Sequence, residues 1–185
     1  MDVVNILKNG GIVVMPTDTI YGIVGSALNQ KTVEKIYQLR KRSLDKPFIV
    51  LIGSIQDLEK FRIQLTQIQK EFLEKNWPNP LSVVLPVVDG KWEYLHRGKN
   101  SLAFRMPKNN QLLDILKEVG PLVAPSANFE GKKPAENIDE AKEYFGENVD
   151  FYIEGSNLSS SPSSLIKLNE DGNFNILRQG EFKIV

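Results

Sequence analysis

Residues 81–119, LSVVLPVVDGKWEYLHRGKNSLAFRMPKNNQLLDILKEV, hold the alternation of elements that decides the fold class. Residues 81–88 are rich in β-branched side chains and predict a strand, and Asp89-Gly90 after them is a hairpin turn signal. A second strand is predicted over residues 101–106, and a helix over residues 110–119. Strands and helices that alternate over short connections indicate an α/β (or α+β) chain with several antiparallel pairs.

The segments before this stretch continue the alternation. Short apolar runs of strand length lie at residues 11–16 and 47–52. Asn29 can cap a helix that runs to about Arg42, and Ser54, with Asp57 in a capping box, begins a short helix. A longer helix over residues 66–76 ends at WPNP, because two prolines cannot continue it.

The segments after residue 119 also alternate between predicted strands and helices. Residues 121–124 lead into the turn PSAN, and Asn137 caps a helix that Gly146 ends. The last strands are expected at residues 151–153, 165–168 and 174–178. No repeat or linker-like boundary interrupts the chain, so we expect a single domain over residues 1–185.

The composition excludes several classes of protein. The chain has no cysteine, which removes disulfides, thiolate nucleophiles and cysteine-bound zinc or iron–sulfur sites. Its 23 basic residues balance its 23 acidic residues, so any RNA contact has to rely on a local patch. The N-terminus resembles neither a signal peptide nor a membrane span, which favours a cytoplasmic protein.

Four polar segments lie at the ends of apolar strands, where side chains are held rigidly and can converge on one cleft. They are PTDTIYG (16–22), RKRSLDKPF (40–48), SLAFRMP (101–107) and APSANFEGKKPA (124–135). The first is by itself typical of a turn with a solvated Asp18. The cations of the second either complement a helix dipole or bind phosphates. Arg105 in the third is either a carboxylate clamp or a charge that protects an edge strand.

Three further features are less specific. A Ser-x-Asn pair, Ser126 and Asn128, is common in plain turns. The serine-rich residues 156–164 suit a solvated loop, or hydroxyls and backbone N–H groups that meet a ligand. The lone histidine, His96, is expected at the surface, and the sequence offers no catalytic triad, histidine metal pair, P-loop or dinucleotide fingerprint.

In this order, the four segments resemble those of the YrdC-like family, the threonylcarbamoyl-AMP synthases of tRNA modification. PTDTIYG is similar to the family's PT[DE]TxYG, residues 40–47 to its KxRxxxKP, SLAFRMP to its V/L-A-x-R-x-P strand, and APSANFEGKKP to its SxN segment. ILRQG (176–180) resembles the closing [IL]xRxG. The combined order and spacing are specific, and the match spans about residues 10–180.

The resemblance implies a twisted mixed sheet with flanking helices around a concave, cation-lined cleft. It also implies that L-threonine, bicarbonate and ATP react to threonylcarbamoyl-AMP and diphosphate. Mg²⁺ is expected to accompany the triphosphate, with no metal bound by the protein alone. Partner proteins of a transferase complex then move the threonylcarbamoyl group onto the adenosine beside the anticodon of tRNA, and direct contact with tRNA is left open.

The resemblance also assigns residues. The catalytic contacts to the phosphates fall to Arg40, Arg42 and Lys46. ATP binding falls to Arg42, Lys46, Ser101, Asn128 and Arg178, and threonine binding to Thr17, Thr19, Arg105, Ser126 and Ser163. Such chemistry depends on positioning and charge rather than on a nucleophilic cysteine or histidine. Arg40 stands where the family has a lysine, so that a planar fork replaces a point charge.

Two other interpretations remain. One is a YrdC-like paralogue with weak or no synthase activity that acts as an RNA-binding module through the cations of residues 40–46 and 132–133. The other is a carbamoyl-transfer domain of the kind used in hydrogenase maturation. The second is disfavoured, because such domains lie in longer chains with zinc-binding cysteines.

Overall fold

A nine-stranded mixed sheet organises the part of the chain that this computed structural model describes, residues 2–158, 161–180 and 182–184. Its strands are β1 (Ile12–Pro16), β2 (Tyr21–Ser26), β3 (Val50–Leu51), β4 (Leu81–Pro86), β5 (Ser101–Arg105), β6 (Leu122–Val123), β7 (Phe151–Tyr152), β8 (Ser164–Leu168) and β9 (Phe174–Arg178). Their order in the sheet is β7-β1-β2-β6-β3-β5-β4-β8-β9. The pairs β3–β5, β4–β8 and β1–β7 are parallel and the others antiparallel, which confirms the expected mixed sheet.

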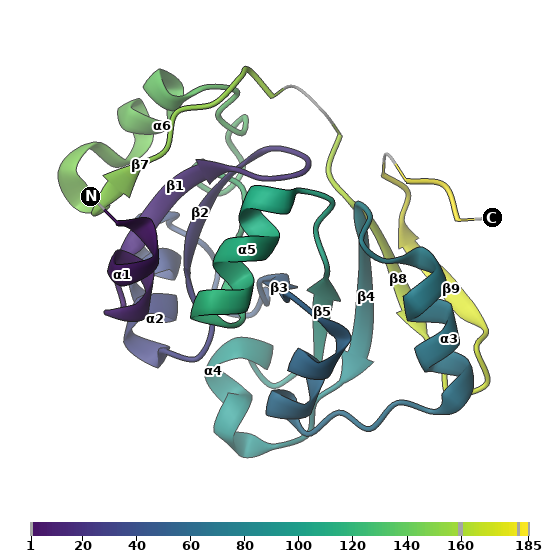
Figure 1. Ribbon diagram of the computed structural model, residues 1–185. Coiled ribbons are helices and arrows are strands. Elements are labelled where there is room, and N and C mark those ends of the chain that lie inside the picture. Colours follow the sequence, from purple (N-terminus) through teal and green to yellow (C-terminus); the bar gives the residue numbers. More distant parts are fainter. Residues whose placement is uncertain (1, 159–160, 181, 185) are drawn as a thin grey trace.

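Helices flank this sheet (Figure 1). They are α1 (Val3–Lys8), α2 (Gln30–Leu39), α3 (Gln67–Asn76), α4 (Glu93–His96), α5 (Asn110–Val119) and α6 (Ile138–Phe145), with short 3₁₀ helices η1 (Ile55–Phe61), η2 (Gly90–Trp92) and η3 (Gly146–Asn148). The side chains of Asn29, Thr66, Asn109 and Asn137 cap the longer helices by accepting backbone N–H groups, as expected of these residue types. None of the described helices is long and apolar enough to cross a lipid bilayer.

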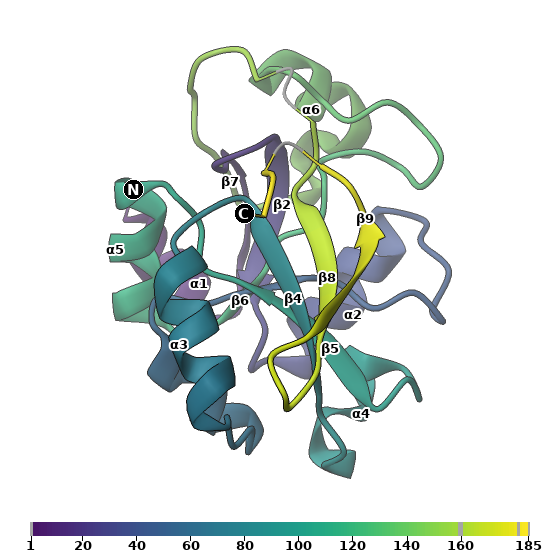
Figure 2. The ribbon, with the colours of Figure 1, turned by 90° about the vertical axis from the view of Figure 1, so that its right-hand side faces the viewer.

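Alternation along the strands divides the core into two clusters. Val13 and Met15 of β1 pack with Leu7 of α1 and with α5. Ile12 and Val14 point the other way and join the larger cluster, which includes residues of α2, η1, α3 and α6. Figure 2 shows α1, α3 and α5 along one side of the molecule.

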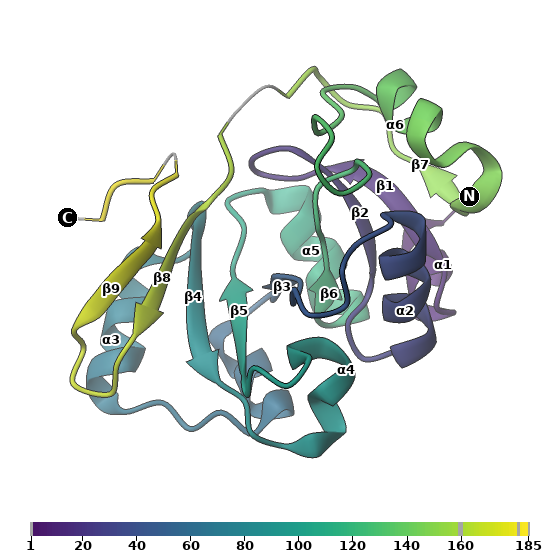
Figure 3. The same cartoon turned by 180° about the vertical axis from the view of Figure 1, so that it is seen from behind.

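One face of β4, β5 and β8 is much less covered than the other. Leu102 and Phe104 of β5 are buried in the larger cluster, whereas Ser101 and Ala103 on the opposite face are partly exposed. Figure 3 shows these strands in front of α3 and α5, with no helix before them. Arg105 belongs to this open face by alternation, so the cleft expected from the sequence opens onto it.

The structure corrects several expected boundaries. Asp89-Gly90 is not a hairpin turn, because Asp89 caps η2 by accepting the Lys91 N–H, and α4 follows before β5 begins. The helix after Asn29 ends at Leu39, with Arg40 as its C-cap, rather than at Arg42. The apolar run at residues 47–52 forms only the two-residue strand β3. Neither α1 nor β2 was predicted.

Candidate functional site

A cavity of about 160 Å³ brings together segments that lie far apart in the sequence. Its walls come from the β1–β2 turn, the segment after α2, the ends of β5 and β9, and the segments after β6 and before β8. Seven of the predicted site residues line it: Thr19, Arg40, Arg42, Arg105, Ser126, Ser163 and Arg178. The four arginines among them make the walls strongly cationic.

Arg105 and Asp18 form a buried ion pair at this cavity. The Nη2 atom of Arg105 lies 3.2 Å from Oδ1 of Asp18, and the two side chains are 6% and 1% exposed. The other oxygen of Asp18 accepts the backbone N–H of Lys108 (3.2 Å). Because β5 lies between β3 and β4, Arg105 is not an edge-strand charge, and Asp18 is not a solvated turn residue. Both of these interpretations of the sequence are wrong.

The environment of Arg105 leaves it able to bind an anion. Burial lowers the pKa of its guanidinium, while Asp18 raises that pKa and Arg178 lowers it. Its Nε has no hydrogen-bond partner among the described residues. A buried donor without a partner is costly, so a carboxylate or phosphate oxygen placed there would be stabilised.

The two threonines of the β1–β2 turn differ in position. Thr17 Oγ1 donates to the carbonyl of Ile20 (2.7 Å) and accepts the N–H of Thr19 (3.2 Å). Both threonines are buried, but only Thr19 lines the cavity. Thr17 therefore shapes the turn that presents Thr19 and Asp18.

Arg40 braces the loop after β6 rather than projecting freely into the cavity. Its Nε donates to the carbonyl of Asn128 (3.1 Å), and its Nη2 donates to Ser126 Oγ and to Asn128 Oδ1 (both 3.0 Å). Arg40 is 3% exposed, and burial lowers its pKa to about 10. The amide of Asn128 donates in turn to the carbonyls of Phe129 and Lys132, so this side chain is committed to the loop.

The remaining cations of the 40–46 segment meet an acid that sequence reasoning missed. Arg42 donates from Nε to the carbonyl of Lys46 (3.1 Å), and its guanidinium lies 5.4 Å from the ring centroid of Phe48. Nζ of Lys46 lies 2.8 Å from Oε1 of Glu130, whose carboxylate is also 3.9 Å from Arg42. Glu130 is the one acidic residue of FEGKK, but its partners are 84 or more positions away in the sequence, so the sequence gives little sign of this pairing.

Arg178 is anchored to the end of the serine-rich segment. Its Nε and Nη2 donate to the carbonyl of Ser163 (3.1 and 2.8 Å), and Ser163 Oγ lies 2.9 Å from Ser82 Oγ of β4. Ser163 is buried, so this end of the segment is not a solvated loop, while Ser159 and Ser160 lie outside the described residues. Burial lowers the pKa of Arg178.

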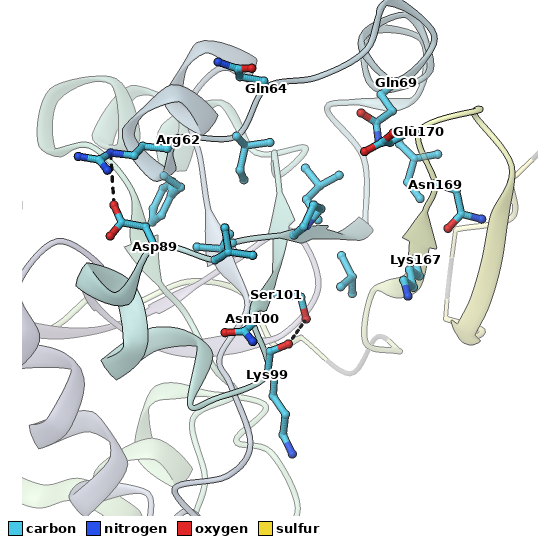
Figure 4. A pocket seen from close by; sticks show the side chains of 18 of the residues that line it. Arg62, Gln64, Gln69, Asp89, Lys99, Asn100, Ser101, Lys167, Asn169 and Glu170 are labelled. Carbon is cyan, nitrogen blue, oxygen red and sulfur yellow. Dashed lines mark hydrogen bonds and ion pairs between the residues drawn. The ribbon is translucent and has the colours of Figure 1, made fainter.

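Ser101 is not brought to the arginines. It lies at the opposite end of β5 from Arg105, roughly 13 Å away at about 3.3 Å per residue. There it lines a second cavity, of about 980 Å³ (Figure 4). This cavity also contains Lys167 of β8 and, at its far side, the Arg62–Asp89 ion pair (3.3 Å). Ser101 and Arg105 share the open face of β5, at its two ends.

His96 is buried within α4, where its Nδ1 accepts the N–H of Gly98 (3.2 Å), so the expected surface position is wrong. Within residues 2–158, 161–180 and 182–184, no three acidic or histidine side chains are grouped as a metal site.

Known proteins resemble this chain in sequence and in fold. The Sua5/YciO/YrdC family model, described as telomere recombination, matches residues 5–180. The threonylcarbamoyl-AMP synthase of Hahella chejuensis is 30% identical over 166 residues, which cover 89% of this chain and 90% of that protein. Pyrococcus abyssi Sua5 in complex with L-threonine superposes with a TM-score of 0.85 at 28% identity, covering 96% of this chain and 52% of that one. Escherichia coli YciO, at 22% identity and a TM-score of 0.82 over 96% of this chain and 86% of its own, shares the fold. The chain belongs to the Sua5/YciO/YrdC family.

Proposed function

We propose that this protein is a threonylcarbamoyl-AMP synthase that converts L-threonine, bicarbonate and ATP to threonylcarbamoyl-AMP and diphosphate. The observation that carries the proposal is the cationic cavity around Arg105, in a family whose relatives bear this name and include a protein crystallised with L-threonine. We extend the proposal to the whole of residues 1–185 as a single domain that carries out both chemical steps.

The threonine end of the site is assigned to the Arg105–Asp18 pair. The Arg105 guanidinium has an unpaired buried Nε, which suits the threonine carboxylate, and Asp18 beside it suits the ammonium group. Thr19, Ser126 and Ser163 line the same cavity, and we assign them to the threonine hydroxyl. A fixed pair of opposite charges would orient the zwitterion in one direction, with its amine facing the reacting carbon.

Two bond changes complete the reaction. Bicarbonate dehydrates to CO₂ and hydroxide, and the hydroxide takes one proton from the threonine ammonium to give water and the neutral amine. The amine then attacks the carbon of CO₂ to make a C–N bond, as one C–O π bond opens and the nitrogen loses a proton to solvent, which gives the carbamate. A carbamate oxygen then attacks the α-phosphorus of ATP, forming an O–P bond as the bond to the bridging oxygen breaks and diphosphate leaves. Arg42, Lys46 and Arg178 are assigned to the phosphates, where their charges would stabilise the transition state.

In this proposal few protein side chains bind the nucleoside or the metal. We assign the nucleoside to the open face of β5, between Arg105 and Ser101, where Ala103 and Val84 are partly exposed. Asn128 contributes by shaping the loop after β6. Mg²⁺ commonly binds through substrate phosphates with one or two carboxylates, so it can enter with ATP without a protein cage.

The test is the dependence of diphosphate release on threonine. Purified protein with ATP, Mg²⁺ and bicarbonate is expected to release diphosphate only when L-threonine is added, and L-alanine serves as the control that lacks the hydroxyl. Release that is equal with and without threonine, or no release at all, would reject the synthase activity. We also propose that a partner complex transfers the threonylcarbamoyl group of this product onto tRNA in the cytoplasm.

The RNA-binding interpretation has less support. Of the cations expected to form its patch, Arg40 is buried, Lys46 pairs with Glu130 (2.8 Å) and Lys133 pairs with Glu136 (3.0 Å). Such neutralised cations release few counterions from a nucleic acid. If direct tRNA contact is a function of this surface, tRNA affinity should fall steeply between about 50 and 200 mM salt, and no binding at low salt would exclude it.

A further inference from the structure

Glu130, in the loop after β6, is fastened to the cationic segment 40–46 by its side chain and by its backbone. Oε1 lies 2.8 Å from Lys46 Nζ and 3.9 Å from Arg42 Nη1. Oε2 accepts the backbone N–H of Ser43 (2.8 Å), and the N–H of Glu130 donates to the carbonyl of Arg40 (2.8 Å). One carboxylate thus meets the Lys46 ammonium, the Ser43 N–H and the Arg42 guanidinium of this segment.

These donors are the kind that hold phosphate groups in proteins. A lysine ammonium, a guanidinium and a backbone N–H converge on a single anionic group, as they do where phosphates bind to loops. The hydrogen bond from Lys46, followed by that from Ser43, lowers the pKa of Glu130 to about 2, so the carboxylate is ionised at neutral pH. The side chain is 25% exposed, so a dissolved anion can reach the same donors.

We propose that Glu130 occupies the phosphate-binding position of segment 40–46 when no nucleotide is bound, and that the triphosphate displaces it on binding. The inference rests on the proposed function, because it takes Arg42 and Lys46 as phosphate ligands. Glu130 thereby sets the affinity for ATP: its carboxylate competes with the substrate, so removing its charge strengthens binding. A residue that contacted the nucleotide favourably would have the opposite effect.

The geometry of the cavity is consistent with displacement. Its volume of about 160 Å³ is below the roughly 300–1,000 Å³ of sites for ligands of this size. Glu130 does not line this cavity but pairs with Arg42, which does, so rotation of the Glu130 side chain would free the Arg42 charge at the edge of the cavity. The backbone bond to Arg40 would keep the loop in place. The exchange therefore needs no rearrangement of the sheet.

The experiment measures binding of ATP and of inorganic tripolyphosphate to the full chain by calorimetry, without threonine. Glu130→Gln keeps the shape and the acceptor for Ser43 but removes the charge, and Glu130→Ala removes both. Both variants are expected to bind both probes about two- to fivefold more tightly than the unaltered chain, as expected for loss of one exposed ion pair. The gain should shrink in high salt, where such charges are screened.

Glu136→Gln is the matched control, because it removes the same charge from an ion pair with Lys133 nearby in the chain. It is expected to leave both affinities unchanged; an equal gain in this variant would reduce the effect to net charge and overturn the proposal. Equal or weaker binding by both Glu130 variants would also overturn it, and weakening seen only with Mg²⁺ would make Glu130 a metal-side residue instead. If tripolyphosphate binds as expected but threonine-dependent diphosphate release is absent, the proposed function fails and the role of Glu130 stands. Failure of the unaltered chain to bind either probe would reject both.

Discussion

Arg105 Nη2 lies 3.2 Å from Asp18 Oδ1, with both side chains almost completely buried at the wall of the cationic cavity. The two residues come from β5 and from the β1–β2 turn, 87 positions apart in the sequence. Two buried charges cost desolvation energy that only their mutual attraction and further hydrogen bonds offset. The pair therefore ties the β1–β2 turn to β5.

Replacing Arg105 should weaken the binding of threonine much more than the binding of ATP. Arg105→Ala is expected to weaken threonine binding by about 10- to 150-fold, the loss of one or two charge-assisted hydrogen bonds, with a much smaller effect on ATP. The separate binding constants of threonine and ATP, measured by calorimetry, check this. Arg62→Ala is the control, because Arg62 is 79% exposed and lies in the second cavity. An equal loss for both substrates would reject Arg105 as the carboxylate ligand.

Replacing Asp18 should affect stability as well as binding. Asp18→Asn keeps the acceptor for the Lys108 N–H but leaves the Arg105 charge buried without its partner, and we expect a loss of about 3 kcal/mol in the free energy of unfolding. Urea unfolding measures it, with Asp114→Asn as a control from an exposed ion pair. The threonine KM should rise more than the ATP KM. Stability equal to the unaltered chain would show that water, rather than Asp18, compensates Arg105.

Arg40→Lys tests whether the planar guanidinium of Arg40 is needed to hold the loop after β6. A lysine keeps the charge but cannot reach Ser126 and both oxygens of Asn128 at once, so the loop after β6 should loosen. We expect a loss of about 1.5–3 kcal/mol in the free energy of unfolding, together with weaker ATP binding. Arg62→Lys, at an exposed position, should change neither. A fully stable Arg40→Lys protein would mean that the loop holds its shape without these hydrogen bonds.

The pH dependence of stability should identify the contribution of Glu130. Its pKa falls from 4.5 to about 2 in the folded protein, so its contribution is fully present above pH 4.5 and is lost as the pH falls towards 2. At pH 7 the unaltered chain should therefore be more stable to urea than Glu130→Gln, and the difference should vanish near pH 2. A difference that grows on acidification would contradict this assignment.

The sequence predicts the longer helices well because their signals are local, whereas the short helices α1 and α4 are missed. Asn29 and Asn137 cap the helices that they were expected to cap, and α5 has the expected bounds. β2 is missed because its two glycines resemble a turn. In the structure Gly25 is needed there, since a Cβ would lie 2.5 Å from Thr32 Cγ2 and 3.0 Å from Ile36 Cδ1 of α2. Only tertiary packing reveals that requirement.

The candidate site is predictable in its composition but not in its contacts. The polar segments at strand ends do converge, and seven predicted residues share one cavity. The partners of the cations could not be foreseen, because Asp18 and Glu130 lie 87 or more positions from Arg105 and Arg42. The same distance in sequence concealed that Arg40 binds the loop after β6.

Arg178 stands on β9, an edge strand of the sheet that is synthesised after β8. A nascent chain that has emerged only as far as β8 already contains Asp18, Arg105 and Ser163, but it lacks the guanidinium that holds the Ser163 carbonyl. Complete assembly of the cationic wall must therefore wait for β9 to pair with β8. A nascent chain that stops after β8 should have most of its core and an unfinished pocket.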